Sequence, residues 1–140
     1  MRESVNIDAV KAMYAAFGRG DIPEILARMD ESILFTIPGS SQIPVSGGRN
    51  GLPQVRRFFE DLAQRYEFTV FEARDYIAQG NRVVALVHYE ARDKVTGRNF
   101  SADSAMLWTF GNGRAIRFQE YTDTEAIANA ARGTQALGAA

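Results

Sequence analysis

The sequence contains no cysteine, and several kinds of protein are excluded by that absence alone. Disulfide scaffolds, thiolate metal sites and cysteine nucleophiles all need this residue. With one histidine and no acidic cluster spaced as in a calcium loop, we expect no bound metal. The Gly-rich segment 46–51 lacks the Lys-Ser/Thr of a phosphate loop, so we interpret it as a flexible rim of a pocket. A chain without cysteine is compatible with a reducing cytoplasm, which is the location we expect.

The chain has no strong excess of either charge and no long apolar run. Its 16 Lys and Arg residues nearly balance 17 Asp and Glu residues, and the formal net charge is −1. We therefore expect neither a nucleic acid nor an anionic membrane surface as a partner. The N-terminus lacks the apolar core of a signal peptide, and no apolar run approaches the roughly 18 residues of a membrane span.

What the chain does have is enough apolar residues for a sizeable core. At 140 residues and 46% hydrophobic, it has the size of one domain with room for a pocket. No internal repeat or composition shift marks a domain boundary. We expect a single domain over residues 1–132 and a disordered, small-residue tail over residues 133–140.

Apolar residues spaced by three and four positions predict three helices in the first half of the chain. The first covers Val5–Phe17, and the second covers Ile22–Met29, where Asp21 and Glu24 have the spacing of a capping box. The third starts near Gly51 and continues to about Tyr66. Three N-terminal helices are therefore expected.

The strand pattern follows mainly in the second half. Ile33–Ile37 reads as a strand, and Gly39–Gly51 reads as a loop or lid. An antiparallel meander is then predicted from four strands separated by turns, over residues 68–78, 83–91, 99–110 and 114–122. A short helix over residues 125–132 ends the pattern. The whole is an α+β fold in which the helices pack on a curved antiparallel sheet and leave a cone-shaped interior.

The last predicted strand carries the first candidate for chemistry. Strand periodicity places Ile116, Phe118 and Glu120 on one face, so a carboxylate ends an apolar row. Elsewhere such a glutamate would be solvated. Inside an apolar pocket, desolvation would raise its pKa toward the range of a general base.

His88 and Glu90 are further candidates, on the same predicted strand face as Val84 and Leu86. If that face is concave, both side chains converge with Glu120 in one acid–base site. The alternatives are a histidine satisfied by one carboxylate without turnover, and a Glu90 that is simply solvated. Asp103 falls on the opposite face of its strand from the apolar row that contains Trp108, where a surface or dimer contact is expected.

Several segments together resemble the nuclear transport factor 2-like superfamily, and within it the SnoaL-like and ketosteroid-isomerase-related proteins. They are Gly18–Asp21, Ile37-Pro38, Gly47–Gly51 and Gly113–Asp123. The resemblance implies a cone-shaped α+β barrel and a cofactor-independent chemistry on small molecules. The same fold carries isomerases, cyclases, hydrolases and non-catalytic modules, so the resemblance is more specific for fold than for function.

The resemblance also implies which residues of this chain occupy the catalytic positions of the family. The catalytic positions of ketosteroid isomerases hold Met13, Met106 and Ile37, which cannot transfer a proton, so that mechanism is rejected. Glu120 matches the catalytic Asp of SnoaL-type cyclases and of limonene epoxide hydrolases. The Arg-x-Asp of the hydrolases aligns with His88-Tyr89-Glu90, in which the residue types differ.

The superfamily's pocket is expected to be lined by apolar and aromatic residues that would otherwise be read as core. These candidate substrate-binding residues are Tyr14, Phe17, Phe35, Ile37, Met106, Trp108 and Phe118.

The leading hypothesis is an enzyme that acts on a small, largely apolar molecule by general acid–base catalysis, as an isomerase, cyclase or epoxide-hydrolase-like hydrolase. Glu120 would be the base and His88 the acid or its partner. A non-catalytic binding or dimerisation module of the same fold is the alternative, and a subunit of a larger complex is a third. A homodimer through the outer sheet face is expected, with Ala105, Leu107 and Tyr121 facing outward.

Overall fold

A computed structural model of the protein describes residues 2–132, and the tail predicted at 133–140 lies outside the described residues. Within residues 2–132, no helix is long and apolar enough to cross a membrane. In chain order the elements are α1 (Arg2–Gly18), α2 (Ile22–Ala27), β1 (Met29–Ile37), β2 (Gly47–Asn50), α3 (Leu52–Arg65), β3 (Tyr66–Gln79), β4 (Arg82–Asp93), β5 (Asn99–Gly111), β6 (Arg114–Tyr121) and α4 (Thr124–Ala131).

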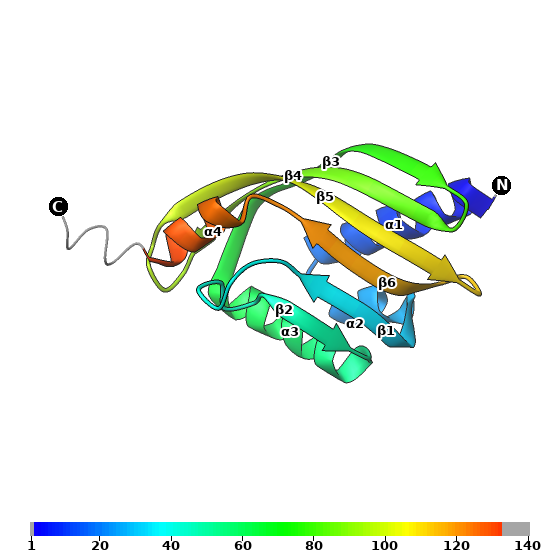
Figure 1. The fold of residues 1–140 in the computed structure, drawn as a ribbon, viewed down its shortest axis with the longest axis horizontal. Helices are drawn as coiled ribbons and strands as arrows, with labels where there is room; N and C mark the ends of the chain where they lie inside the picture. The colour runs from blue at the N-terminus through cyan, green and yellow to red at the C-terminus, as the bar shows by residue number, and fades with distance from the viewer. Residues whose placement is uncertain (1, 133–140) are drawn as a thin grey trace.

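The strands form one curved, unclosed sheet in the order β2-β1-β6-β5-β4-β3 (Figure 1). Strands β3 to β6 make the predicted antiparallel meander. Strand β1 pairs with β6 in parallel, so the sheet is mixed and not wholly antiparallel. Helix α1 contacts β3 and β4, α3 contacts β1 and β3, and α4 contacts β5. The predicted α+β cone with three N-terminal helices and a short C-terminal helix is confirmed.

Two boundaries in the first half differ from the prediction. Helix α2 ends at Ala27, and β1 begins at Met29, because Met29 is paired with Ala115 of β6 and belongs to the sheet. The predicted loop over Gly39–Gly51 contains strand β2, which pairs with the end of β1. The sequence of β2, Gly-Gly-Arg-Asn, has little β propensity, and the pairing with β1 overrides it.

A bulge in β6 changes which side chains face the interior. Thr109 of β5 pairs with Arg117, whereas the next residue, Phe110, pairs with Ala115. The extra residue breaks the alternation of the strand, so Ala115 is buried and Ile116 is 38% exposed. The prediction that Ile116 shares the inner face is therefore wrong, whereas Phe118 and Glu120 do lie inside.

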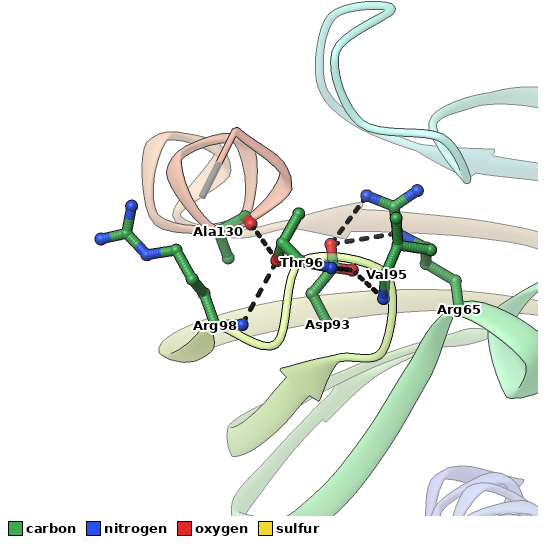
Figure 2. Close-up of polar contacts among 6 residues, drawn as sticks. All are labelled: Arg65, Asp93, Val95, Thr96, Arg98 and Ala130. Atoms are coloured by element: carbon green, nitrogen blue, oxygen red, sulfur yellow. Dashed lines mark hydrogen bonds and ion pairs between the residues drawn. The ribbon is translucent and has the colours of Figure 1, made fainter. Parts of the chain in front are cut away.

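The turn between β4 and β5 is built on a buried carboxylate, Asp93, which is 0% exposed (Figure 2). Its Oδ2 accepts hydrogen bonds from Nε and Nη2 of Arg65, at 3.0 and 2.8 Å. Its Oδ1 accepts from the backbone N–H groups of Val95 and Thr96, at 2.9 and 3.2 Å. The Thr96 hydroxyl donates to the carbonyl of Ala130 at 2.7 Å, so the same turn anchors α4.

Candidate functional site

An apolar cavity of about 100 Å³ lies between the inner face of the sheet and helices α1 to α3. All the predicted substrate-binding residues line it, namely Tyr14, Phe17, Phe35, Ile37, Met106, Trp108 and Phe118. Its described lining contains no lysine, arginine or histidine. The positions of these residues agree with the prediction, and their role in binding a substrate stays a prediction.

On one wall of the cavity, the polar side-chain atoms are hydrogen-bonded to one another. The rings of Phe35 and Trp108 each lie 4.5 Å, centroid to centroid, from the ring of Phe118. The indole Nε1 of Trp108 donates to the hydroxyl of Tyr14 at 3.0 Å, and that hydroxyl donates to Sδ of Met106 at 3.2 Å. Burial raises the pKa of Tyr14 far above its ordinary value, so this phenol stays neutral.

Glu120 is the one carboxylate among the described lining residues, and it is only 7% exposed. Its Oε2 accepts hydrogen bonds from the hydroxyls of Tyr89 and Ser104, both at 2.9 Å. No donor among residues 2–132 reaches Oε1, which leaves this oxygen available to a ligand. Burial raises the pKa of Glu120, against the smaller lowering that the Ser104 and Tyr89 hydrogen bonds cause.

The register of three neighbouring strands brings these groups together. Glu120 of β6 is opposite Met106 of β5, and Ser104 lies two residues away on the same face of β5. Tyr89 of β4 is opposite Ala102, one inward position further along β5. The Tyr89 hydroxyl also lies 2.7 Å from Oγ1 of Thr122. Because the Tyr89 proton is directed at Glu120, the Thr122 hydroxyl is the donor in this second bond.

Residues 10–118 match the family described as the SnoaL-like domain. The chain belongs to this family. An NTF2-like protein from Burkholderia xenovorans LB400 is 31% identical, with 92% of this chain and 97% of that one covered and a TM-score of 0.85. TerC, co-crystallised with polyporic acid, is 25% identical over 91% of this chain and 98% of its own, with a TM-score of 0.80. A proposed isomerase from Rhodopseudomonas palustris is 23% identical, with 92% of this chain and 93% of that one covered and a TM-score of 0.73. This likeness shows the fold alone.

His88 and Glu90 of this SnoaL-like protein do not reach the cavity. Both lie on the outer face of the sheet, where Nε2 of His88 is 2.8 Å from Oε2 of Glu90 and Nδ1 is 2.8 Å from Oδ1 of Asp103. The two neighbours of His88, Val87 and Tyr89, are buried on the inner face, and strand alternation turns His88 outward. The predicted convergence with Glu120 is wrong, and the outward position of Asp103 is confirmed.

The electrostatics of His88 fit a surface charge cluster. Its hydrogen bond to Glu90, and then the one to Asp103, raise its pKa above the ordinary value. Both carboxylates are solvated, with side-chain exposures of 48% for Glu90 and 83% for Asp103. Both ring nitrogens of His88 are hydrogen-bonded to carboxylates. This is close to the alternative hypothesis from the sequence, in which a carboxylate pairs with the histidine without turnover.

Tyr89 and Thr122 are site residues that the sequence pattern did not predict, and it did not predict the contact of Ser104 with Glu120 either. For Tyr89 a signal was available in β4. The inward set is apolar apart from this tyrosine and the final aspartate: Val83, Ala85, Val87, Tyr89, Ala91 and Asp93. The outward set carries most of the charge: Arg82, Val84, Leu86, His88, Glu90 and Arg92. Comparing the charge of the two faces would have placed Tyr89 inside and His88 outside.

The remaining predicted features lie away from the cavity of the SnoaL-like protein. Ala105, Leu107 and Tyr121 lie on the outer face, and Tyr121 is 57% exposed. A homodimer through this face stays a prediction. Among residues 2–132, no group of three or more His, Asp or Glu side chains could hold a metal ion.

Proposed function

We propose that the protein is an enzyme that carries out general acid–base catalysis on a small, largely apolar molecule, with Glu120 as the base. The single observation that carries the proposal is the state of this carboxylate. Oε2 is fixed by two hydroxyl donors, Oε1 accepts no hydrogen bond from residues 2–132, and the Glu120 side chain lines an apolar cavity. A carboxyl with a raised pKa is more basic once it ionises, which suits proton abstraction near neutral pH.

The surroundings of Glu120 favour proton transfer to and from carbon or water. Oε1 would take a proton from a carbon next to a carbonyl, as in an isomerase or cyclase, or from a water, as in a hydrolase. Ser104 and the Thr122–Tyr89 chain would hold the carboxylate in one orientation throughout. Burial raises the pKa of Tyr89 well above its ordinary value, so this tyrosine serves as a neutral donor.

A matched pair of glutamate variants tests the proposal. Exchange of the α-hydrogens of 1-indanone in D2O, and opening of indene oxide in ¹⁸O-labelled water, would be followed by mass spectrometry. We expect at least one reaction to be accelerated, and Glu120→Gln to slow it by about 100-fold or more. Glu60→Gln, an exposed change on α3, should leave it unchanged. Equal rates in the wild type and Glu120→Gln would contradict the proposal.

A non-catalytic binding module of the same fold is the second candidate. The observation that favours it is that His88, the predicted acid, lies outside the cavity, which leaves only hydroxyl groups beside Glu120. If the wild type binds 1-indanone but accelerates neither reaction, the binding module is the better account. The co-crystal of TerC with polyporic acid is compatible with both candidates, since it concerns a bound small molecule.

A further inference from the structure

Residues 39–46, called the lid segment below, leave the sheet between β1 and β2 and cover one side of the cavity. The β1–β2 ladder ends at the pair Ile37 and Gly47, and in the described part of the chain no backbone-to-backbone hydrogen bond joins the lid segment to a helix or a strand. Two of its side chains, Ile43 and Val45, are 2% and 5% exposed and line the cavity. The segment is therefore held against the cavity by side chains and not by backbone pairing.

The lid segment has the internal contacts of a body that can move as a unit. The N–H of Ile43 donates to the carbonyl of Ser40, and the N–H of Ser46 donates to the carbonyl of Ile43, both at 3.0 Å. The Ser46 hydroxyl also donates to the carbonyl of Ser40, at 2.8 Å. Gly39 at the start of the segment and Gly47 just after its end have φ angles of +120° and +117°, which glycine alone adopts readily. These two glycines are suitable hinges.

Arg49 of β2 fastens the lid segment to the rest of the fold. Its Nη1 donates to the carbonyl of Val45 at 2.6 Å and to that of the glycine after the segment at 3.1 Å. Its guanidinium lies 4.9 Å from the centroid of the Phe58 ring, which lines the cavity. Arg132 at the end of α4 donates to the amide oxygen of Gln42. Polar contacts to the segment thus come from a few side chains at its edges.

Ile43 can occupy its place in the cavity wall because residue 39 is a glycine. A Cβ atom at position 39 would lie 2.5 Å from Cδ1 of Ile43, a separation that real Cβ atoms essentially never show. A Cβ atom at Gly47 would meet nothing within 4 Å. A substitution at 39 should therefore displace Ile43, whereas one at 47 should strain the backbone only.

We propose that the lid segment opens to admit a small molecule to the cavity and closes over it, with Arg49 as the latch. The proposal rests on the proposed function in taking this cavity as the ligand site, and it concerns access to that site. The part of the ligand under the lid is apolar, because the segment contributes only Ile43 and Val45 to the lining. Closure removes water from the cavity beside Glu120, which strengthens the electrostatic effect of a buried carboxylate.

Quenching of Trp108 fluorescence by acrylamide tests the lid in the full chain without any ligand. Trp108 is the single tryptophan, lines the cavity and is 3% exposed, so the quencher reaches it when the cavity opens. Gly39→Ala should raise the quenching rate constant about 3- to 10-fold, because the displaced Ile43 no longer closes the cavity. Gly47→Ala is the matched control. It has nearly the same backbone strain without the contact to Ile43, and its quenching should stay close to that of the wild type.

The latch is tested in the same way. Arg49→Met keeps a long side chain beside Phe58 but removes both hydrogen bonds to the lid, and it should raise the quenching rate constant about 3- to 10-fold. Arg57→Met, an exposed change on α3, should leave it unchanged. In stopped-flow binding of 1-indanone, Gly39→Ala and Arg49→Met should speed both association and dissociation. Thermal denaturation checks that each variant is folded at the temperature of measurement.

Equal quenching in Gly39→Ala and Gly47→Ala would overturn the lid, and unchanged quenching in Arg49→Met would overturn the latch. Unchanged association rates of 1-indanone in both lid variants would also overturn the proposal. The entrance would then be the wider pocket of about 510 Å³ beside the turn between α1 and α2, which shares part of the cavity lining. Failure of the proposed function is a separate result, because quenching needs neither turnover nor 1-indanone. Glu120→Gln should leave the quenching unchanged, whether or not it abolishes exchange.

Discussion

Asp93 and Glu120 are two buried carboxylates, and the fold treats them in opposite ways. Asp93 accepts four hydrogen bonds, two of them from the guanidinium of Arg65, and both of its oxygens are used. Glu120 accepts two, both on Oε2 and both from neutral hydroxyls. No cation lies in the described lining of its cavity.

The difference shows how burial alone fails to identify a functional acid. A buried carboxylate that is paired with a cation and fully hydrogen-bonded does structural work, as Asp93 does in holding the β4–β5 turn. A buried carboxylate that is held in one orientation, but has an oxygen without a hydrogen bond, keeps its desolvation penalty. That penalty raises its pKa and makes it more basic. The comparison predicts that removing each carboxylate changes stability in opposite directions.

The largest effect is expected from Asp93→Ala. The change leaves the Arg65 guanidinium without its partner and two turn N–H groups without an acceptor. The free energy of unfolding should fall by about 2–4 kcal/mol, less than for a fully buried pair because the Arg65 side chain is 20% exposed. Urea denaturation measures it. Asp61→Ala, an exposed change on α3, should stay within about 0.5 kcal/mol of the wild type.

Glu120→Gln should be stabilising, and increasingly so with pH. The pKa of Glu120 is higher in the folded state than in the unfolded chain, so the wild type loses stability as pH rises from the ordinary glutamate value through the raised one. Glutamine has no proton to lose. Thermal denaturation at pH 5 and pH 8 should show a gain that grows toward pH 8, on the order of 1 kcal/mol. A constant difference or a loss at pH 8 would show that burial does not penalise this carboxylate.

Tyr89→Phe tests whether the hydroxyl donors tune Glu120. Its hydrogen bond favours the ionised carboxylate, so removing it should raise the pKa of Glu120 further. The rising limb of the rate–pH profile should move to higher pH, and the exchange rate at pH 7 should fall about 3- to 10-fold. An unshifted profile would mean that Tyr89 does not act through Glu120. Tyr76→Phe, the same change on β3 outside the cavity lining, serves as the matched control.

The smallest effect is expected from His88→Gln on the outer face. The hydrogen bonds to the carboxylates of Glu90 and Asp103 raise the pKa of His88, against weaker opposing effects of desolvation and then of Arg74. The stability gained from this cluster is present below the ordinary histidine value and is lost as pH rises through the raised one. His88→Gln should lower the melting temperature at pH 6 by no more than about 2 °C, and less at pH 9. A larger loss at pH 9 would contradict this assignment.

The sequence predicted the order of helices and strands better than it predicted which strand residues face the interior. Helix periodicity, capping residues and turns gave the element order, and the row of Met106 and Trp108 lies inside as expected. The bulge that turns Ile116 outward has no local signature, because it is a property of the pairing between β5 and β6. To identify the inner face of β4, the charge of its two faces had to be compared. His88 was predicted as a site residue because histidine is a common acid or base, and Tyr89 beside it was overlooked.

Glu120 could be predicted because its position in the strand and the resemblance to SnoaL-like proteins agreed. The contacts of Tyr89 and Ser104 with Glu120 could not be predicted in the same way, since they depend on which hydroxyl reaches which oxygen across neighbouring strands. Such contacts depend on register and burial, which a single sequence does not specify.

The most direct test of the account is a pH titration of the Glu120 side-chain carboxyl by ¹³C NMR, assigned by its absence in Glu120→Gln. A carboxylate held as a base in an apolar cavity should titrate with a midpoint clearly above the value of about 4.3 for an unperturbed glutamate. A midpoint at or below that value would show a carboxylate ionised and solvated like a surface residue, and would contradict a base held ready in an apolar cavity.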